Sequence, residues 1–156
     1  MKKKIDWTLL CICVVVTLAV GFAGNLLGGN TEEIYPQLEK PPLSPPAAVF
    51  PVVWTALYLC LGVGIYFIAE KKSEYGKGTL GLYAVTLIAN ALWPLWFRRL
   101  HLYTFAAFWI GAMVVLAVFL LYRARRESKT ATWLFVPYLV WLCFALYLNV
   151  GVAVLN

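Results

Sequence analysis

The chain has 156 residues, of which 63% are hydrophobic and 13% are charged, and its formal net charge is +6. Soluble domains carry about 25% charged residues, so this composition excludes an ordinary soluble fold. Five long apolar stretches contain no Asp, Glu, Lys, Arg or His. Their lack of charge argues against a charge-driven pump or ion exchanger, because such proteins place ionisable groups at membrane depth.

Each apolar stretch is long enough to cross a bilayer as a helix, which takes about 20 residues. The stretches cover residues 7–27, 47–69, 79–97, 102–122 and 132–155. They leave room only for short connections, so we predict an all-α membrane protein with one domain, residues 1–156, built as a bundle of five transmembrane helices. The first stretch is longer than the roughly 7–15 apolar residues of a signal peptide, so we expect it to remain as an uncleaved span.

The distribution of basic residues predicts an orientation in the membrane. Ten of the thirteen lie in the N-terminal segment and in the second and fourth connections, namely Lys2, Lys3, Lys4, Lys71, Lys72, Lys77, Arg123, Arg125, Arg126 and Lys129. The positive-inside rule then predicts a cytoplasmic N-terminus and an external C-terminus, as expected for an integral protein of a bacterial plasma membrane. We expect these residues to contact lipid headgroups and not nucleic acid.

The first connection, residues 28–46, is the only long one. It contains an acidic pair, Glu32 and Glu33, then Tyr35 and five prolines. Prolines fix φ and disfavour helix in the preceding residue, so this segment is expected to be stiff and extended. It is either a lid over the mouth of the bundle or a simple spacer. Ser44 is expected to cap the second helix.

Two features bear on how the helices pack. Prolines 94 and 137 lie inside the third and fifth stretches, where a kink would splay the helices and open a cavity. Membrane helices also tolerate proline without any pocket. Gly24 and Gly28 form a small-residue motif that favours close helix packing within the bundle, with a homodimer contact as the alternative.

Aromatic and polar residues share helical faces within these stretches. The candidate ligand-binding residues, at spacings of three and four, are Trp54, Tyr58, Asn90, Trp93, Trp141, Phe144 and Ala145. They suit either a flat apolar pocket for a planar ligand or plain aromatic core packing. His101 is the only histidine, and no Cys or His spacing of a metal site occurs, so no metal and no conventional catalytic centre is expected.

Three segments resemble the motifs of a known family. KPPLSPPAAVFPVVWTALYLCLGVG, NALWPLWF and VPYLVWLCFALYLN are similar to motifs of the TspO/MBR family, the tryptophan-rich sensory proteins and translocator proteins. They occur in the family's order and spacing, and with the five stretches they cover almost the whole chain. Two departures are visible: Leu43 stands where the family usually has Trp, and Pro51-Val52 stands where it has Gly-Pro.

The resemblance implies five helices around a ligand cavity that opens toward the first connection. It also implies binding of porphyrins such as protoporphyrin IX, haem-related tetrapyrroles and benzodiazepine-type drugs, with no required cofactor. Tyr35 and Trp141 match positions implicated in porphyrin breakdown, so they are the candidate catalytic residues. Sterol binding is not expected at the segment after the last motif, VGVAVLN, because it contains no Lys or Arg.

Arg98 and Arg99 follow the third stretch, where they are expected to pair with porphyrin propionates. The leading interpretation is a membrane receptor for porphyrins and drug-like planar ligands. Light- and oxygen-dependent degradation of the bound porphyrin is an enzyme-like extension of it. The alternatives are a passive transporter of porphyrin or other lipophiles and a stress-sensory scaffold.

Overall fold

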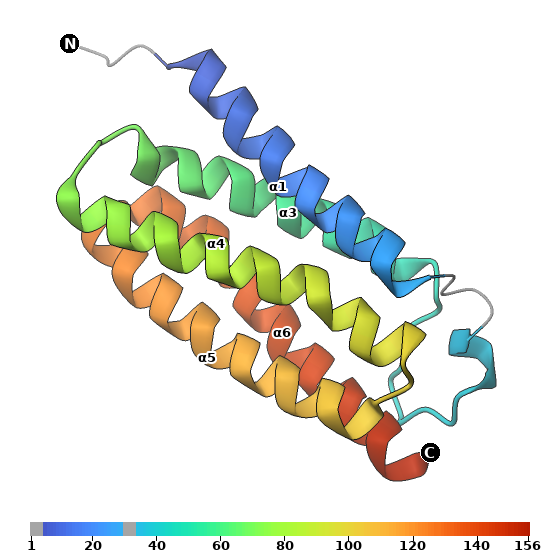
Figure 1. Cartoon of the computed structure of the whole chain (residues 1–156). Coiled ribbons are helices and arrows are strands. Elements are labelled where there is room, and N and C mark those ends of the chain that lie inside the picture. The colour runs from blue at the N-terminus through green and yellow to red at the C-terminus, as the bar shows by residue number, and fades with distance from the viewer. Residues whose placement is uncertain (1–4, 30–33) are drawn as a thin grey trace.

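The computed structural model of the chain describes residues 5–29 and 34–156 (Figure 1). The long helices are α1 (Trp7–Gly28), α3 (Val49–Ala69), α4 (Glu74–Pro94), α5 (Tyr103–Glu127) and α6 (Lys129–Leu155). With α4 continued to Arg99, all five are long and apolar enough to cross a membrane. The expected all-α membrane fold with five spanning helices is therefore confirmed.

Side-chain caps move several helix ends away from the predicted positions. Ser73 Oγ accepts a hydrogen bond from the Gly76 N–H at 2.8 Å, so α4 begins at Glu74, five residues before the apolar stretch. Ser128 caps α6 through the Ala131 N–H in the same way. Apolar length measures the hydrocarbon crossing, whereas capping sets where the backbone becomes helical.

The expected cap at Ser44 is wrong. The Ser44 hydroxyl donates to the Pro41 carbonyl at 2.7 Å, within the first connection. The second long helix, α3, instead begins at Val49, and no side chain caps it. The reason is local: the chain turns after Pro46, so Ser44 lies too far ahead of the first helical N–H groups to accept from them.

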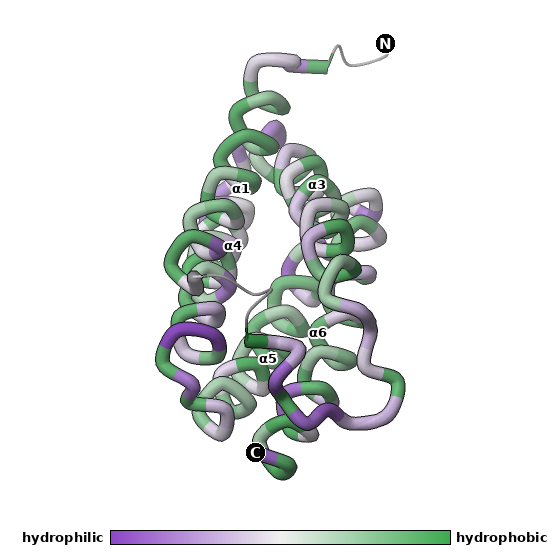
Figure 2. Tube along the Cα trace, turned by 90° about the vertical axis from the view of Figure 1, so that its right-hand side faces the viewer, coloured by the Kyte–Doolittle hydropathy of each residue, from purple (hydrophilic) through white to green (hydrophobic). Residues whose placement is uncertain are grey.

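The helices form a closed ring in the order α1, α3, α6, α5, α4 and back to α1. Figure 2 shows apolar residues along all five, with hydrophilic residues gathered at helix ends and in the connection between α1 and α3. This connection contains a short 3₁₀ helix, η1 (Tyr35–Gln37). It lies at the same end of the bundle as the C-terminus (Figure 1).

Many large side chains are fully buried toward the opposite end of the bundle. They come from the second half of α3, the second half of α5 and the first half of α6: Leu61, Ile68, Leu120, Phe135 and Tyr138. This core seals one end of the bundle. The other end is free to hold a cavity.

Two glycines bring α1 against α4. A Cβ atom at Gly24 would lie 2.7 Å from the Ala91 Cα, and one at Gly28 would collide with the side chains of Pro94 and Arg98. Close backbone approach is the usual role of small residues in membrane helices. The expected packing of this motif within the bundle is therefore what the structure has.

A proline changes the end of α4. Pro94 is the last residue of α4, and a π-helix, η2 (Leu95–Arg99), continues the same axis, with the Leu100 N–H donating to the Leu95 carbonyl at 3.0 Å. A wider π turn accommodates a helix whose regular hydrogen bonds are interrupted. The third span therefore ends at Arg99 and not at residue 97. This correction places Arg98 on a helix instead of in a connection.

Candidate functional site

A cavity of about 520 Å³ occupies the end of the bundle beside the first connection. Small-molecule sites usually measure about 300–1,000 Å³. Its walls come from α1, α3, α4, η2 and α6, with Ile110 of α5, and residues 34–48 of the first connection cover its mouth. The predicted cavity under the first connection is therefore present, and Pro51 and Pro94 are both among its lining residues.

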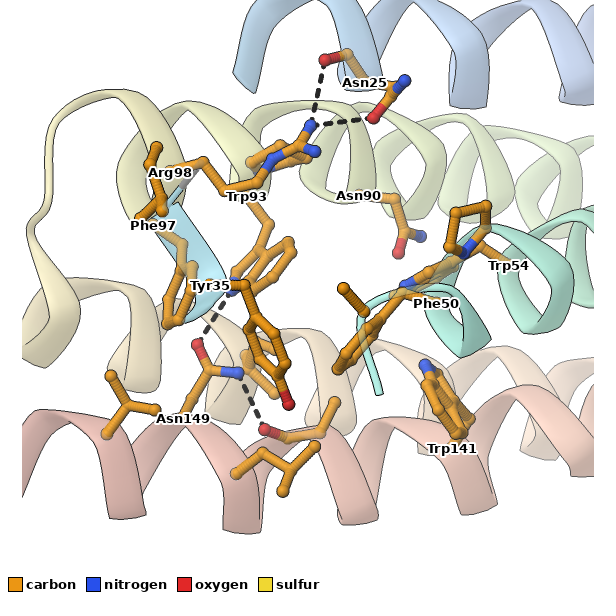
Figure 3. A pocket seen from close by; sticks show the side chains of 18 of the residues that line it. Asn25, Tyr35, Phe50, Trp54, Asn90, Trp93, Phe97, Arg98, Trp141 and Asn149 are labelled. Atoms are coloured by element: carbon orange, nitrogen blue, oxygen red, sulfur yellow. Dashed lines mark hydrogen bonds between the residues drawn. The ribbon is translucent and has the colours of Figure 1, made fainter. Parts of the chain in front are cut away.

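Aromatic rings line the cavity from several elements (Figure 3). Trp93 and Phe97 are stacked, with ring centroids 5.0 Å apart. Trp54 lies against Tyr58 on α3, with centroids at 5.6 Å. Trp141 faces them from α6. The structure thus brings three indoles from three helices around one space.

Most of the sequence-predicted residues line this cavity. They are Tyr35, Trp54, Tyr58, Asn90, Trp93, Arg98, Trp141 and Ala145. Two are placed elsewhere. Phe144 is outside the lining and packs against Trp141, with ring centroids 5.5 Å apart. Arg99 is exposed, one residue beyond the buried Arg98.

Arg98 is buried, with 7% of its surface exposed. Its Nη2 donates to both the backbone carbonyl and the Oδ1 of Asn25, at 2.9 and 3.0 Å. These bonds join η2 to the end of α1. Because Gly28 has no side chain, the guanidinium can lie directly against α1. A fixed positive charge therefore lies in the wall of a mostly apolar cavity.

Two buried asparagines, Asn90 on α4 and Asn149 on α6, each bond to an aromatic residue of the other helix. Asn149 Nδ2 donates to the Ala145 carbonyl at 2.8 Å, and Asn149 Oδ1 accepts from Trp93 Nε1 at 3.1 Å. Asn90 Nδ2 donates to the Thr86 carbonyl at 2.9 Å and to the Tyr138 hydroxyl at 2.7 Å. Both amides thus cross between helices, and both line the cavity.

The first connection is tied down over the cavity by its own contacts. The Tyr35 hydroxyl donates to the Pro45 carbonyl at 2.8 Å. Lys40 Nζ donates to the carbonyls of Tyr35 and Leu38 and lies 5.1 Å from the Tyr35 ring centroid. Burial raises the pKa of the Tyr35 phenol, so the hydroxyl stays protonated as a donor.

The same segment is also fastened to α6. The Tyr147 hydroxyl donates to the Pro42 carbonyl at 2.8 Å. The Asn156 side chain accepts from the Glu39 N–H and donates to the Glu39 carbonyl. A spacer needs no such ties, so these contacts favour a lid. The acidic pair, Glu32 and Glu33, lies outside the described residues.

The candidate residues predicted from the sequence leave out several lining residues, namely Asn25, Phe50, Phe97 and Asn149. Helical spacing does group two of these with the candidates, because Asn149 continues the i, i+4 series of Trp141 and Ala145, and Phe97 lies one turn after Trp93. Asn25 is the single polar amide in the first apolar stretch. Among the described residues, no group of His, Cys, Asp and Glu is placed to hold a metal ion.

Comparison with known proteins matches the sequence to one family. The family model described as TspO/MBR covers residues 13–155. The chain is 34% identical to the tryptophan-rich protein TspO of Chlorobaculum tepidum, over 100% of this chain and 99% of the relative. It is 33% identical to the tryptophan-rich sensory protein of Cereibacter sphaeroides, over 98% and 94% of the two chains. It is 34% identical to the translocator protein of Ovis aries, over 84% and 85%. The chain is an integral membrane protein and belongs to the TspO/MBR family.

Proposed function

We propose that this protein is a membrane receptor that binds porphyrins, and benzodiazepine-type ligands, in the cavity under the first connection. The observation that carries the proposal is the set of indoles around one cavity, Trp54, Trp93 and Trp141, with Arg98 in its wall. A porphyrin is a flat apolar ring, and flat aromatic side chains suit its two faces. A cavity of this size and polarity suits a ligand of this kind.

The carboxylates at the edge of a porphyrin would pair with a basic side chain of the cavity. Porphyrins such as protoporphyrin IX carry two propionates, and guanidinium groups pair with carboxylates through short, charge-assisted hydrogen bonds. Arg98 lines the cavity, whereas Arg99 is exposed outside it. We therefore assign the main propionate contact to Arg98. Lys40, at the mouth, is the second basic group that lines the cavity.

A titration in the dark tests this proposal. Protoporphyrin IX is added to the purified protein while Trp fluorescence is followed. Saturable quenching is expected, and a measurable part of its amplitude should disappear in a Trp54→Phe variant, in which Trp93 and Trp141 still line the cavity. Trp133 is the matched control, because it is 73% exposed on α6 and does not line the cavity. Quenching that never saturates, or that depends equally on both tryptophans, would contradict the proposal.

A chain of aromatic contacts favours a second activity at the same site, the photo-oxidative breakdown of bound porphyrin. The Tyr35 ring lies 5.2 Å from the Phe50 ring, which lies 6.1 Å from the Trp141 ring. In this scheme the excited porphyrin gives an electron to dioxygen, forming superoxide. Trp141 then returns an electron to the oxidised porphyrin and passes its N–H proton to superoxide, which leaves a Trp141 radical and a hydroperoxyl radical. The hydroperoxyl radical adds to a methine carbon of the porphyrin, and the Trp141 radical takes up the hydrogen atom of that carbon. Trp141 is thereby restored, and the pigment carries a hydroperoxide at which its ring can open.

This second activity has its own test. Illumination of the porphyrin complex in air should cause loss of pigment absorbance in the wild type. Trp141→Phe should bind porphyrin and degrade it several-fold more slowly, because phenylalanine is much harder to oxidise than an indole. An equal rate of pigment loss in the variant would remove Trp141 from the reaction.

A further inference from the structure

Two arginines near the end of α5 converge on one aromatic ring of α4. The guanidinium carbon of Arg123 lies 4.1 Å from the centre of the Tyr75 ring, and that of Arg126 lies 5.8 Å from the same centre. Both distances are within the range of cation–π contacts. The two guanidinium carbons are therefore at most 9.9 Å apart, the sum of these two distances. Like charges this close repel each other, so the arrangement favours an anion that contacts both.

The guanidinium of Arg123 is held in place by α4. Its Nε donates to Thr79 Oγ1 at 3.1 Å, and its Nη2 donates to the Tyr75 carbonyl at 2.7 Å. Gly78 leaves the space that the guanidinium needs, because a Cβ atom there would lie 2.6 Å from Arg123 Nη2. A guanidinium has five N–H donors, and these two bonds leave most of them for another partner.

No carboxylate neutralises this pair of charges. Among the residues that the structure describes, neither arginine forms an ion pair with an acid. The acids nearest in sequence have other partners: Glu74 pairs with Lys77 at 2.5 Å, and Glu127 Oε1 accepts from the Ser73 hydroxyl at 2.8 Å. The counter-ion of the two guanidiniums would therefore come from outside this part of the chain.

The depth of the site in the bundle indicates which anion reaches it. Thr79 begins the third apolar stretch and Tyr122 ends the fourth. Thr79 accepts from Arg123, and the Tyr122 hydroxyl accepts from Arg126. The arginines thus lie at the border of the hydrocarbon core, at the end of the bundle away from the C-terminus (Figure 1). Lipid headgroups, and the tyrosines that accompany them, occupy this level of a membrane.

The lipid-facing side of α5 continues from the arginines as an apolar strip. It consists of Val115, Val118, Phe119 and Tyr122, each of which is at least half exposed. Val118, Tyr122 and Arg126 follow one another at intervals of four and therefore share one face of the helix. A phospholipid has the same order, with a phosphate above apolar chains, whereas a soluble anion makes no use of such a strip.

We propose that Arg123 and Arg126 bind the phosphate of one anionic phospholipid of the phosphatidylglycerol type, whose acyl chains lie along the apolar strip of α5. The phosphate oxygens accept charge-assisted hydrogen bonds from both guanidiniums. The bound phosphate also removes the repulsion between the two charges and thereby strengthens the link that Arg123 makes from α5 to α4. Arg125 and Lys129 are exposed at the same end and attract anionic lipid through their charge only. The site is independent of the cavity and of the proposed function.

Native mass spectrometry of the purified protein, with phosphatidylglycerol or with phosphatidylcholine of the same acyl chains, tests the proposal. The wild type should bind one phosphatidylglycerol about tenfold more tightly than phosphatidylcholine. Arg126→Gln should remove most of this preference. Arg125→Gln is the matched control, because it removes the same charge from the adjacent exposed residue. It should change the preference less than about twofold, since a charge without a direct contact is screened by salt.

A second pair of variants tests the geometry without changing the net charge. Gly78→Ala places a Cβ atom against Arg123 Nη2 and so displaces the guanidinium, which is the flexible end of a long side chain. This variant should fold and lose phosphatidylglycerol affinity several-fold. Gly81→Ala is the control, because a Cβ atom there would meet no atom within 4 Å, and it should bind as the wild type does.

Three results would overturn the proposal. Equal wild-type affinities for the two lipids would exclude a phosphate site with this charge preference. Equal losses in Arg126→Gln and Arg125→Gln would show attraction by net charge alone. Glycerol phosphate supplies the phosphate without acyl chains and should not raise the melting temperature at concentrations where phosphatidylglycerol does. Equal protection by both would reassign the arginines to a soluble anion.

Discussion

Trp93 Nε1 donates a hydrogen bond to Asn149 Oδ1 at 3.1 Å, and this bond joins α4 to α6 beside the cavity. It satisfies the indole N–H of a large aromatic residue, and it leaves the Trp93 ring stacked on Phe97. The amide of Asn149 is itself fixed by its bond to the Ala145 carbonyl. One interhelical bond thus holds the position of an aromatic wall of the proposed binding site.

A double-mutant cycle should detect this bond. Asn149→Leu leaves the Trp93 N–H unpaired in the membrane interior, whereas Trp93→Phe removes the donor itself. We expect a coupling free energy of about 0.5–2 kcal/mol between the two changes, the range of interhelical hydrogen bonds in membranes. Thermal unfolding in detergent of the wild type, both single variants and the double variant measures it. Additive effects would show that the bond contributes nothing to stability.

The charge of Arg98 should increase the binding affinity of anionic ligands only. Arg98→Gln is expected to weaken protoporphyrin IX binding about tenfold or more, because charge-assisted hydrogen bonds are the strong ones. Protoporphyrin dimethyl ester has no carboxylates, so the same variant should bind it nearly as the wild type does. Arg99→Gln is the neighbouring control and should leave both affinities unchanged, since Arg99 is exposed. An equal loss for acid and ester would indicate a purely structural role of Arg98.

Because α1 packs closely on α4, a substitution at the contacting glycine should destabilise the fold, whereas one at an exposed glycine should not. Gly24→Leu is expected to destabilise the fold by about 1–3 kcal/mol, because its side chain would meet the Ala91 backbone. Gly81 is exposed, and a Cβ atom there would meet no atom within 4 Å, so Gly81→Leu should be tolerated. Melting temperatures in detergent compare the two. If both glycines prove equally tolerant, α1 does not pack against α4 as described.

The lid should loosen at high pH through Tyr35. Its phenol donates to the Pro45 carbonyl only while it is protonated. Burial raises the Tyr35 pKa above its usual value of about 10. The stabilising bond is therefore fully present below about pH 10 and is lost as the pH rises through the higher folded-state pKa. Porphyrin dissociation from the wild type should accelerate in that range.

Tyr35→Phe separates this effect from other groups. The variant should release porphyrin several-fold faster than the wild type at neutral pH, and the difference between the two should vanish at high pH. The other titratable groups are present in both proteins, so their effects cancel in the comparison. Stopped-flow dissociation against excess apoprotein measures the rates. A constant difference at every pH would exclude the phenol as the titrating group.

Many of the residues that line the cavity could be predicted from the sequence, because helical spacing alone shows which side chains share one face of a helix. Asn90 and Trp93, or Trp141 and Ala145, lie one turn apart on any α-helix, and both pairs do line the cavity. The same logic fails for Phe144, which is adjacent to Ala145 but packs against Trp141 outside the lining. Neighbours in sequence point about 100° apart, so apolar character alone does not assign the face.

What the sequence could not predict depends on backbone irregularities and on long-range contacts. Arg98 looks like a connection residue, and only the π-helix after Pro94 brings it beside Asn25. Sequence alone does not distinguish a lid from a spacer, because the ties of the first connection to Tyr147 and Asn156 join residues 105 and 117 positions apart. Such contacts have no local pattern in the sequence.

The most direct test of the central claim is to fill the cavity from within. Ala145 is a small, buried lining residue, 6% exposed, and Ala145→Phe would place a ring in the space that the porphyrin is proposed to occupy. The variant should fold and melt cooperatively yet lose saturable protoporphyrin IX binding in the dark. Unchanged affinity in a folded Ala145→Phe protein would show that porphyrin binds somewhere other than this cavity.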